Sequence, residues 1–345
     1  MKKAAEKGEP GSMRNLGLLY YGGHGVAPDY AKAREWYEKA AQEGDAVAMS
    51  NLGLLYTNGQ GVAQDYVEAR KWYEKAAEKG DAGAMTNLGA LYAEGRGVAQ
   101  DTAKAREWYA KAAEIGEVTA MSNLGVIYVN GQGAAQDYGK AREWFEKAAE
   151  KGDAKGMHNL GVLYENGYGV AQDYGKAREW FEKAADKGDA AAKAVLENVS
   201  ILAAEEAGRY AEALKLVQAR AAKEEVAETE RDAKAGKQTA RALNEVAWYA
   251  LFAQEFTQAL SAADRAHALL PGDLEIDINR AHALMFLGRG EESEALYLAH
   301  KGEPMSDEDR SLWESAIAKD FADLRKTGLP HPMMAEIEKK LGVSP

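Results

Sequence analysis

Residues 45–80 read DAVAMSNLGLLYTNGQGVAQDYVEARKWYEKAAEKG, and this stretch carries the signals of two helices joined by a turn. Asp45 follows a glycine and is suited to cap a first helix, whose apolar residues recur at helical spacing. Those apolar residues are Ala48, Met49, Leu52, Leu55 and Tyr56. The glycine-rich TNGQG segment predicts a turn, and Asp65 then caps a second helix. The buried stripe predicted for the second helix is Ala69, Trp72, Tyr73, Ala76 and Ala77.

This two-helix unit recurs with a constant period of 36 residues, and no insertion breaks the register. The asparagine of the Asn-Leu-Gly triplet in the first helix is found at Asn15, Asn51, Asn87, Asn123 and Asn159. The tryptophan of the second helix is found at Trp36, Trp72, Trp108, Trp144 and Trp180. Such strict repetition predicts tandem structural units, each stacked on the next.

A glycine stands inside the first helix of every copy. Gly53, for example, directly follows Asn51 and Leu52. A glycine in a helix interior costs about 1 kcal/mol relative to alanine. Its recurrence therefore indicates that a neighbouring helix approaches closely at this position.

The shared pattern is A-x-x-M-x-N-L-G-x-x-Y-x-x-G-x-G-V-x-x-D-x-x-x-A-R-x-W-[YF]-x-K-A-A, and it closely resembles the Sel1-like repeat. That family is related to the tetratricopeptide repeat and has a longer loop within each unit. The resemblance covers about residues 1–190, and the fourth copy departs from it only by Ala134 in place of valine. Together with the helical periodicity, it implies an all-α fold, a right-handed α-solenoid of antiparallel helix pairs.

The remainder of the chain keeps helical patterning but loses the strict period, and parts of it resemble tetratricopeptide repeats. The predicted organisation is a truncated helix at 1–8, five Sel1-like repeats within 1–190, a transitional tetratricopeptide-like helix pair at 191–222, a charged helix or linker at 223–238, two tetratricopeptide-like repeats at 239–304 and capping helices at 305–345. A cap is expected because the last repeat would otherwise expose its apolar face.

The opening segment KKAAEKG matches the end of a second helix, so we expect that the chain was cut from a longer protein. The C-terminal run that contains RALNEVAWYALFAQEF is similar to the tails of bacterial caspase-like proteins that carry these repeats. This resemblance implies an alternative function, the regulatory or substrate-recruiting region of a larger enzyme whose catalytic domain lies upstream. The chain has no cysteine, so it cannot supply the nucleophile of such a peptidase itself.

Composition and motifs exclude several classes of function. The net charge of −12 argues against nucleic acid as a partner. No apolar run approaches the roughly 20 residues that span a bilayer, and no signal peptide follows Met1, so we expect no membrane insertion and the cytoplasm is favoured. The glycine-rich loops follow helices, whereas a phosphate loop follows a strand. Neither a catalytic residue, a cofactor nor a metal is predicted, although His267 and His282 lie on neighbouring predicted helices.

The asparagine row is the predicted partner-binding feature. We expect the first helices to line the concave groove, where an amide can both donate to and accept from an extended peptide backbone. The alternative is a structural hydrogen bond to the backbone of the neighbouring repeat. Variable residues expected to flank the row in the groove include Arg14, Leu54, Thr86, Val126, His158 and Glu165.

The tryptophan row has two interpretations as well, inter-repeat packing or an aromatic binding ladder, and packing is favoured because large aromatics at helical spacing are usually buried.

Taken together, these features predict a non-catalytic protein–protein interaction scaffold. Its ligand is a protein or a peptide, held as an extended segment or a helix in the concave groove.

Overall fold

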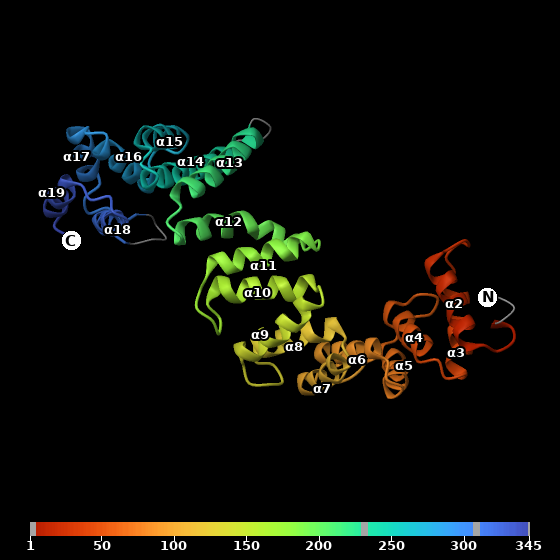
Figure 1. Cartoon of the computed structure of the whole chain (residues 1–345). Coiled ribbons are helices and arrows are strands. Elements are labelled where there is room, and N and C mark those ends of the chain that lie inside the picture. The colour runs from red at the N-terminus through yellow and green to blue at the C-terminus, as the bar shows by residue number, and fades with distance from the viewer. Residues whose placement is uncertain (1–4, 229–233, 306–310, 344–345) are drawn as a thin grey trace. The chain divides into compact units, whose positions relative to one another are not determined.

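The computed structural model describes residues 5–228, 234–305 and 311–343. Within these ranges the chain is helical, with no β-strand and one isolated bridge between Pro304 and Leu312 (Figure 1). The prediction of an all-α solenoid of antiparallel helix pairs is confirmed. The chain divides into two compact units, unit 1 (Met1–Ala194) and unit 2 (Val195–Pro345).

Unit 1 is a row of helix pairs in which each first helix precedes a turn and a second helix. The first helices are α2 (Pro10–Gly22), α4 (Ala46–Asn58), α6 (Ala82–Glu94), α8 (Val118–Asn130) and α10 (Ala154–Asn166). The second helices are α3 (Tyr30–Gln42), α5 (Tyr66–Glu78), α7 (Thr102–Glu114), α9 (Tyr138–Glu150) and α11 (Tyr174–Asp186).

The helix ends follow the expected capping chemistry. The Asp45 carboxylate accepts a hydrogen bond from the Ala48 amide (2.8 Å), and α4 ends where Gly59 adopts a left-handed conformation (φ 68°). Asp65 accepts from the amides of Val67 and Glu68 at the start of α5. Each pair is therefore delimited by its own local sequence.

A buried aromatic ring of the second helix packs on the glycine of the first helix. A Cβ atom added to Gly53 would stand 2.5 Å from the Tyr73 ring, and one added to Gly125 would stand 2.3 Å from the Phe145 ring. The five rings are almost fully buried: Tyr37, Tyr73, Tyr109, Phe145 and Phe181. The close approach inferred from the repeated glycine is thus a ring-on-glycine contact within each pair.

Neighbouring pairs are joined through the glycine-rich turns. Gly97 has φ 66°, and a Cβ atom added to it would stand 2.5 Å from the Tyr66 carbonyl carbon at the start of the preceding second helix. Arg106 donates to the Gly133 carbonyl oxygen of the next turn (3.1 Å). From the second turn onward, each turn therefore packs against the pair before it, which explains why its length does not vary.

The tryptophan row is half-buried. The Trp36, Trp72 and Trp108 rings pack against the buried cluster of the first pairs, and Lys75 Nζ lies 4.3 Å from the Trp72 ring centroid. The other four tryptophans have the equivalent lysine at 4.1–4.4 Å. These contacts favour the packing interpretation over the binding ladder.

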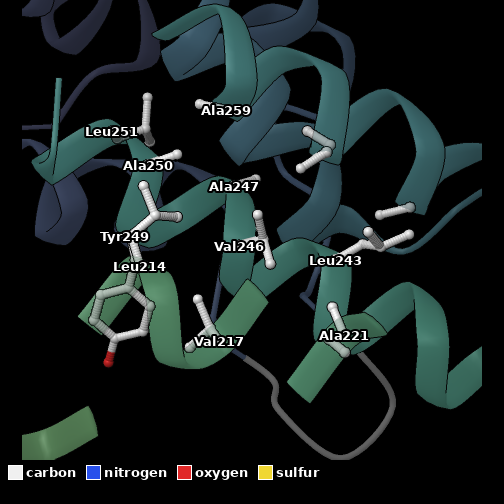
Figure 2. Close-up of a cluster of buried hydrophobic side chains, with 14 of the residues drawn as sticks. Leu214, Val217, Ala221, Leu243, Val246, Ala247, Tyr249, Ala250, Leu251 and Ala259 are labelled. Atoms are coloured by element: carbon white, nitrogen blue, oxygen red, sulfur yellow. The ribbon is translucent and has the colours of Figure 1, made fainter. Parts of the chain in front are cut away.

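Unit 2 contains helices of less regular length, from 10 residues in α17 to 19 residues in α14. They are α12 (Ala190–Glu206), which crosses the division between the units, α13 (Tyr210–Glu228), α14 (Lys234–Phe252), α15 (Phe256–Leu269), α16 (Leu274–Phe286), α17 (Gly290–Ala299), α18 (Trp313–Lys326) and α19 (Pro332–Leu341). Figure 2 shows part of one buried cluster, in which Leu214, Val217 and Ala221 of α13 meet residues of α14 such as Val246.

The helices of unit 2 can be compared with the segments predicted for this part of the chain. The described parts of the charged segment 223–238 are helical: they form the last residues of α13 and the first residues of α14. Residues 1–4 of the predicted truncated helix and residues 306–310 of the predicted capping region lie outside the described residues. The first helix of the capping region, α18, begins at Trp313, directly after Leu312, which pairs with Pro304 in the isolated bridge. The finer division of the chain into domains stays a prediction.

The last two helices are held together by a buried ion pair. Both carboxylate oxygens of Glu338 accept from the Arg325 guanidinium at 2.6 Å, and Glu338 is 1 % exposed. The hydrogen bonds from Arg325 to this carboxylate raise the pKa of the guanidinium. The bidentate pair fixes α19 against α18.

We predict that Gly89→Ala destabilises unit 1 by about 1–3 kcal/mol, because the new methyl group would stand 2.5 Å from the Tyr109 ring. The matched control is Gly83→Ala in the same helix, where the methyl group has ordinary contacts and should stabilise the helix by up to about 1 kcal/mol. Urea unfolding followed by circular dichroism measures both changes. Equal stability of the two variants would contradict the ring-on-glycine contact.

We predict that Arg325→Ala lowers the free energy of unfolding of unit 2 by about 1–3 kcal/mol, since it leaves the buried Glu338 carboxylate without its bidentate partner. Lys326→Ala, at the exposed neighbouring position, should change it by less than about 0.5 kcal/mol. Hydrogen exchange of the α19 amides reports the loss directly. Unchanged protection of α19 in Arg325→Ala would show that the pair does not hold the helix.

Candidate functional site

The first helices of unit 1 form a nearly uncharged surface. Helices α4 and α8 contain no Asp, Glu, Lys or Arg, whereas α5 reads YVEARKWYEKAAE. Apolar side chains remain open to solvent on the first helices, with Leu18 42 % and Val126 40 % exposed. We call the row Leu18, Leu54, Ala90, Val126 and Val162, with the residues beside it on the same helices, the first-helix face; Leu18 and Val126 are exposed, and the other three are half-buried.

The predicted asparagine row lies beside this face, and all five asparagines are half-buried. The Asn123 amide hydrogen-bonds the hydroxyl of Tyr109, which belongs to the preceding pair. Burial raises the pKa of Tyr109 to about 12, and the hydrogen bond from Asn123 opposes that rise. The Asn51 Nδ2 atom is buried and has no hydrogen-bond partner among the described residues. At Asn123 the partner is thus a side-chain hydroxyl and not the backbone of a neighbouring repeat, and the role of the asparagine row stays a prediction.

The residues directly before the asparagines contact the next pair. Arg14 Nη1 lies 2.9 Å from Asp45 Oδ2, and His158 Nδ1 lies 3.3 Å from Asp189 Oδ1. Ser122, at the equivalent position, donates to Asp153. Asp45, Asp153 and Asp189 cap α4, α10 and α12, the helices that open the following pairs, so these three contacts link one first helix to the next.

The six variable groove residues differ in accessibility. The sequence predicts that Thr86 is accessible in the groove. It is only 8 % exposed, however, and its hydroxyl donates to the Ala82 carbonyl oxygen (3.0 Å), so its side chain is closed to a ligand. The Arg14 and His158 side chains are 30 % and 23 % exposed. Leu54 and Glu165 are half-buried, and Val126 is the most open of the set. Their role in binding stays a prediction.

Unit 2 contains a groove for which the sequence analysis named no residue. Two adjoining cavities of about 720 and 600 Å³ share Asn244, Glu245, Glu275 and Met305. Asn279 Nδ2 donates to Asn244 Oδ1 (2.9 Å) between α16 and α14. The sequence did contain a signal for this contact, because the two asparagines, 35 residues apart, occupy corresponding places in the two successive repeats predicted at 239–304.

His267 and His282, which lie on neighbouring helices, contact different partners. His267 Nδ1 lies 2.9 Å from Asp277 Oδ1, while His282 contacts Asp320 (3.2 Å) and the Tyr297 hydroxyl. In the described part of the chain, no group of three or more His, Asp or Glu side chains is placed to hold a metal ion.

None of the helices in that part is long and apolar enough to cross a membrane.

Helix pairs that stack in a row and present one long surface of side chains define an α-solenoid repeat protein. Five consecutive segments match the model of the Sel1 repeat, at residues 10–45, 46–81, 82–117, 118–153 and 154–189. These segments cover more than half of the chain, which therefore belongs to the Sel1 repeat family.

Two solved structures illustrate the likeness. A Sel1 repeat protein from Oxalobacter formigenes is 38 % identical, with a TM-score of 0.54, over 56 % of this chain and 79 % of its own. The protein c5321, a protective antigen of uropathogenic Escherichia coli strains with an SLR fold, is 27 % identical, with a TM-score of 0.60, over 99 % of this chain and 75 % of its own. Among curated proteins, no sequence matches the chain. The alternative of an upstream caspase-like domain stays a prediction.

We predict a favourable coupling energy of about 0.5–1.5 kcal/mol between Asn123 and Tyr109, because the amide bonds a buried hydroxyl. The double-mutant cycle uses Asn123→Ala, Tyr109→Phe and the pair, followed by urea unfolding. Asn159→Ala is the matched control, since the residue equivalent to Tyr109 is there Phe145, which has no hydroxyl. Asn159→Ala should lower the free energy of unfolding by less than Asn123→Ala does. Additive effects of the two substitutions in the cycle would contradict the structural role of Asn123.

Proposed function

We propose that the chain is a protein-interaction scaffold, without catalysis of its own, that holds a peptide or a helix of a partner protein on the first-helix face of unit 1. Helical repeat proteins of this kind generally mediate protein–protein interactions through extended surfaces. The observation that carries the proposal is the contrast between the two sets of helices, one nearly uncharged with exposed apolar side chains and the other densely charged.

The proposed mode of binding follows from that contrast. Apolar anchors of a partner helix or strand bury surface against Leu18, Leu54 and Val126, and each such side chain contributes through the loss of apolar area from water. A charged second-helix surface would offer no comparable gain, because exposed ion pairs contribute little. The asparagines beside the row supply amide groups for the partner's backbone where they are not used within the frame.

A site-specific photo-crosslinker tests the location. Benzoylphenylalanine at position 126 should capture the partner in the host, whereas the same group at position 67 should not. Val126 and Val67 are 40 % and 43 % exposed, but Val67 lies on the second helix α5. Equal capture at both positions would contradict the proposal.

A charge introduced into the face should weaken the captured partner's binding. We predict that Val126→Glu lowers the affinity at least about tenfold, which corresponds to about 1.4 kcal/mol, because a carboxylate must be desolvated against apolar contacts. Val67→Glu should leave the affinity unchanged. Both substitutions are at exposed positions, so the free energy of unfolding should change by less than about 0.5 kcal/mol in each.

A further inference from the structure

The first helices of unit 1 carry a row of methionines at 36-residue spacing, and one of them differs from the others in its burial. The row is Met13, Met49, Met85, Met121 and Met157. Four of these side chains are buried, with exposed fractions of 5–8 %, whereas Met85 is half-buried. The chain has no cysteine, so its sulfur atoms are all methionine thioethers. Because oxidation follows exposure, Met85 is the thioether of this row that a small oxidant reaches most readily.

Met85 lies where two buried clusters of unit 1 meet. One cluster is built mainly from α2 to α6 and includes Leu88 and Leu91. The other is built from α7 to α9 and includes Tyr109 and Leu124. Met85, on α6, packs against both clusters. A chemical change at this side chain therefore acts on the contact between the clusters, within the helix pair α6 and α7.

The chemistry of a thioether makes this contact sensitive to oxidation. A methionine side chain is flexible and apolar, and it fills irregular gaps in a core. When a hydroperoxide attacks, a sulfur lone pair forms an S–O bond to one peroxide oxygen and the O–O bond breaks. The other oxygen leaves as water or an alcohol, with the proton that the transferred oxygen gives up. The sulfur is thereby oxidised to a polar sulfoxide, which is unfavourable among apolar side chains.

We propose that Met85 is the oxidation site of unit 1, where a hydroperoxide converts an apolar contact between two clusters into a polar one and loosens the pair α6 and α7. The change is reversible, since methionine sulfoxide reductases return the sulfoxide to the thioether. The chain itself has no thiol for this reduction, so the reductase and its thiol reductant come from outside. This oxidation acts on the stability of unit 1 and is independent of the proposed partner binding.

The first measurement is the rate of oxidation at each methionine of the full chain. Hydrogen peroxide is the oxidant, and mass spectrometry of peptides follows the sulfoxide over time. Met85 should be oxidised at least about fivefold faster than Met121, which occupies the same place in the next repeat but is 5 % exposed. Equal rates at these two residues would overturn the proposal.

The second measurement is the hydrogen exchange of the α6 and α7 amides before and after oxidation. Protection should fall about tenfold when Met85 is fully converted, and treatment with methionine sulfoxide reductases A and B should restore it. Met305 and Met333 are half-buried as well, but they belong to unit 2 and lie outside this readout. Unchanged protection of α6 and α7 at full conversion would overturn the proposal.

Two substitutions locate the effect. Met85→Leu keeps an apolar side chain of similar volume, so it should retain the fold by circular dichroism and abolish the loss of protection caused by peroxide. Met121→Leu, the matched control, should leave that loss in place. A loss of α6 and α7 protection that persists in oxidised Met85→Leu would assign the sensitivity to another residue and overturn the proposal. The rates and the exchange in the unmodified chain test it independently of how either variant folds.

Discussion

The contact between a buried aromatic ring and a helical glycine sets the geometry of unit 1. The ring occupies the space that a side chain would need, so the two helices of a pair approach until the Tyr73 ring meets the Gly53 backbone. The stabilisation comes from the burial of a large apolar ring, and it outweighs the cost of about 1 kcal/mol for each helical glycine. Because the same contact recurs in every pair, each pair presents its remaining side chains to solvent in the same way.

That regularity explains the separation of structural and exposed positions. The second helices use tryptophan, lysine and arginine to cover the core and to contact the turns, as in the bond from Arg106 to the Gly133 carbonyl. The first helices need few charges, because their caps and their aspartate contacts hold successive pairs together. Apolar residues such as Val126 are then left exposed without a structural role, and an exposed apolar row is the kind of surface that a partner protein covers.

Much of the fold could be predicted from the sequence, since a 36-residue period reports each helix pair directly. The roles of single residues were harder to predict. Thr86 is buried and Arg14 pairs with Asp45, because both depend on how one first helix approaches the next, which no single repeat encodes. The groove of unit 2 was missed for a similar reason. Its walls come from three helices, and although Asn244 and Asn279 occupy corresponding places in α14 and α16, no single helix encodes how closely these helices approach.

The packing of each turn on the pair before it has a consequence for how such a protein can change in evolution. Gly97 rests on the start of α5, and Gly133 rests on the start of α7 in the same manner. A gene rearrangement that removed or duplicated one 36-residue segment would therefore rebuild the same junction on both sides. The length of the exposed row would change by one step with each event, so the reach of the scaffold is a quantity that selection can adjust without redesigning any interface.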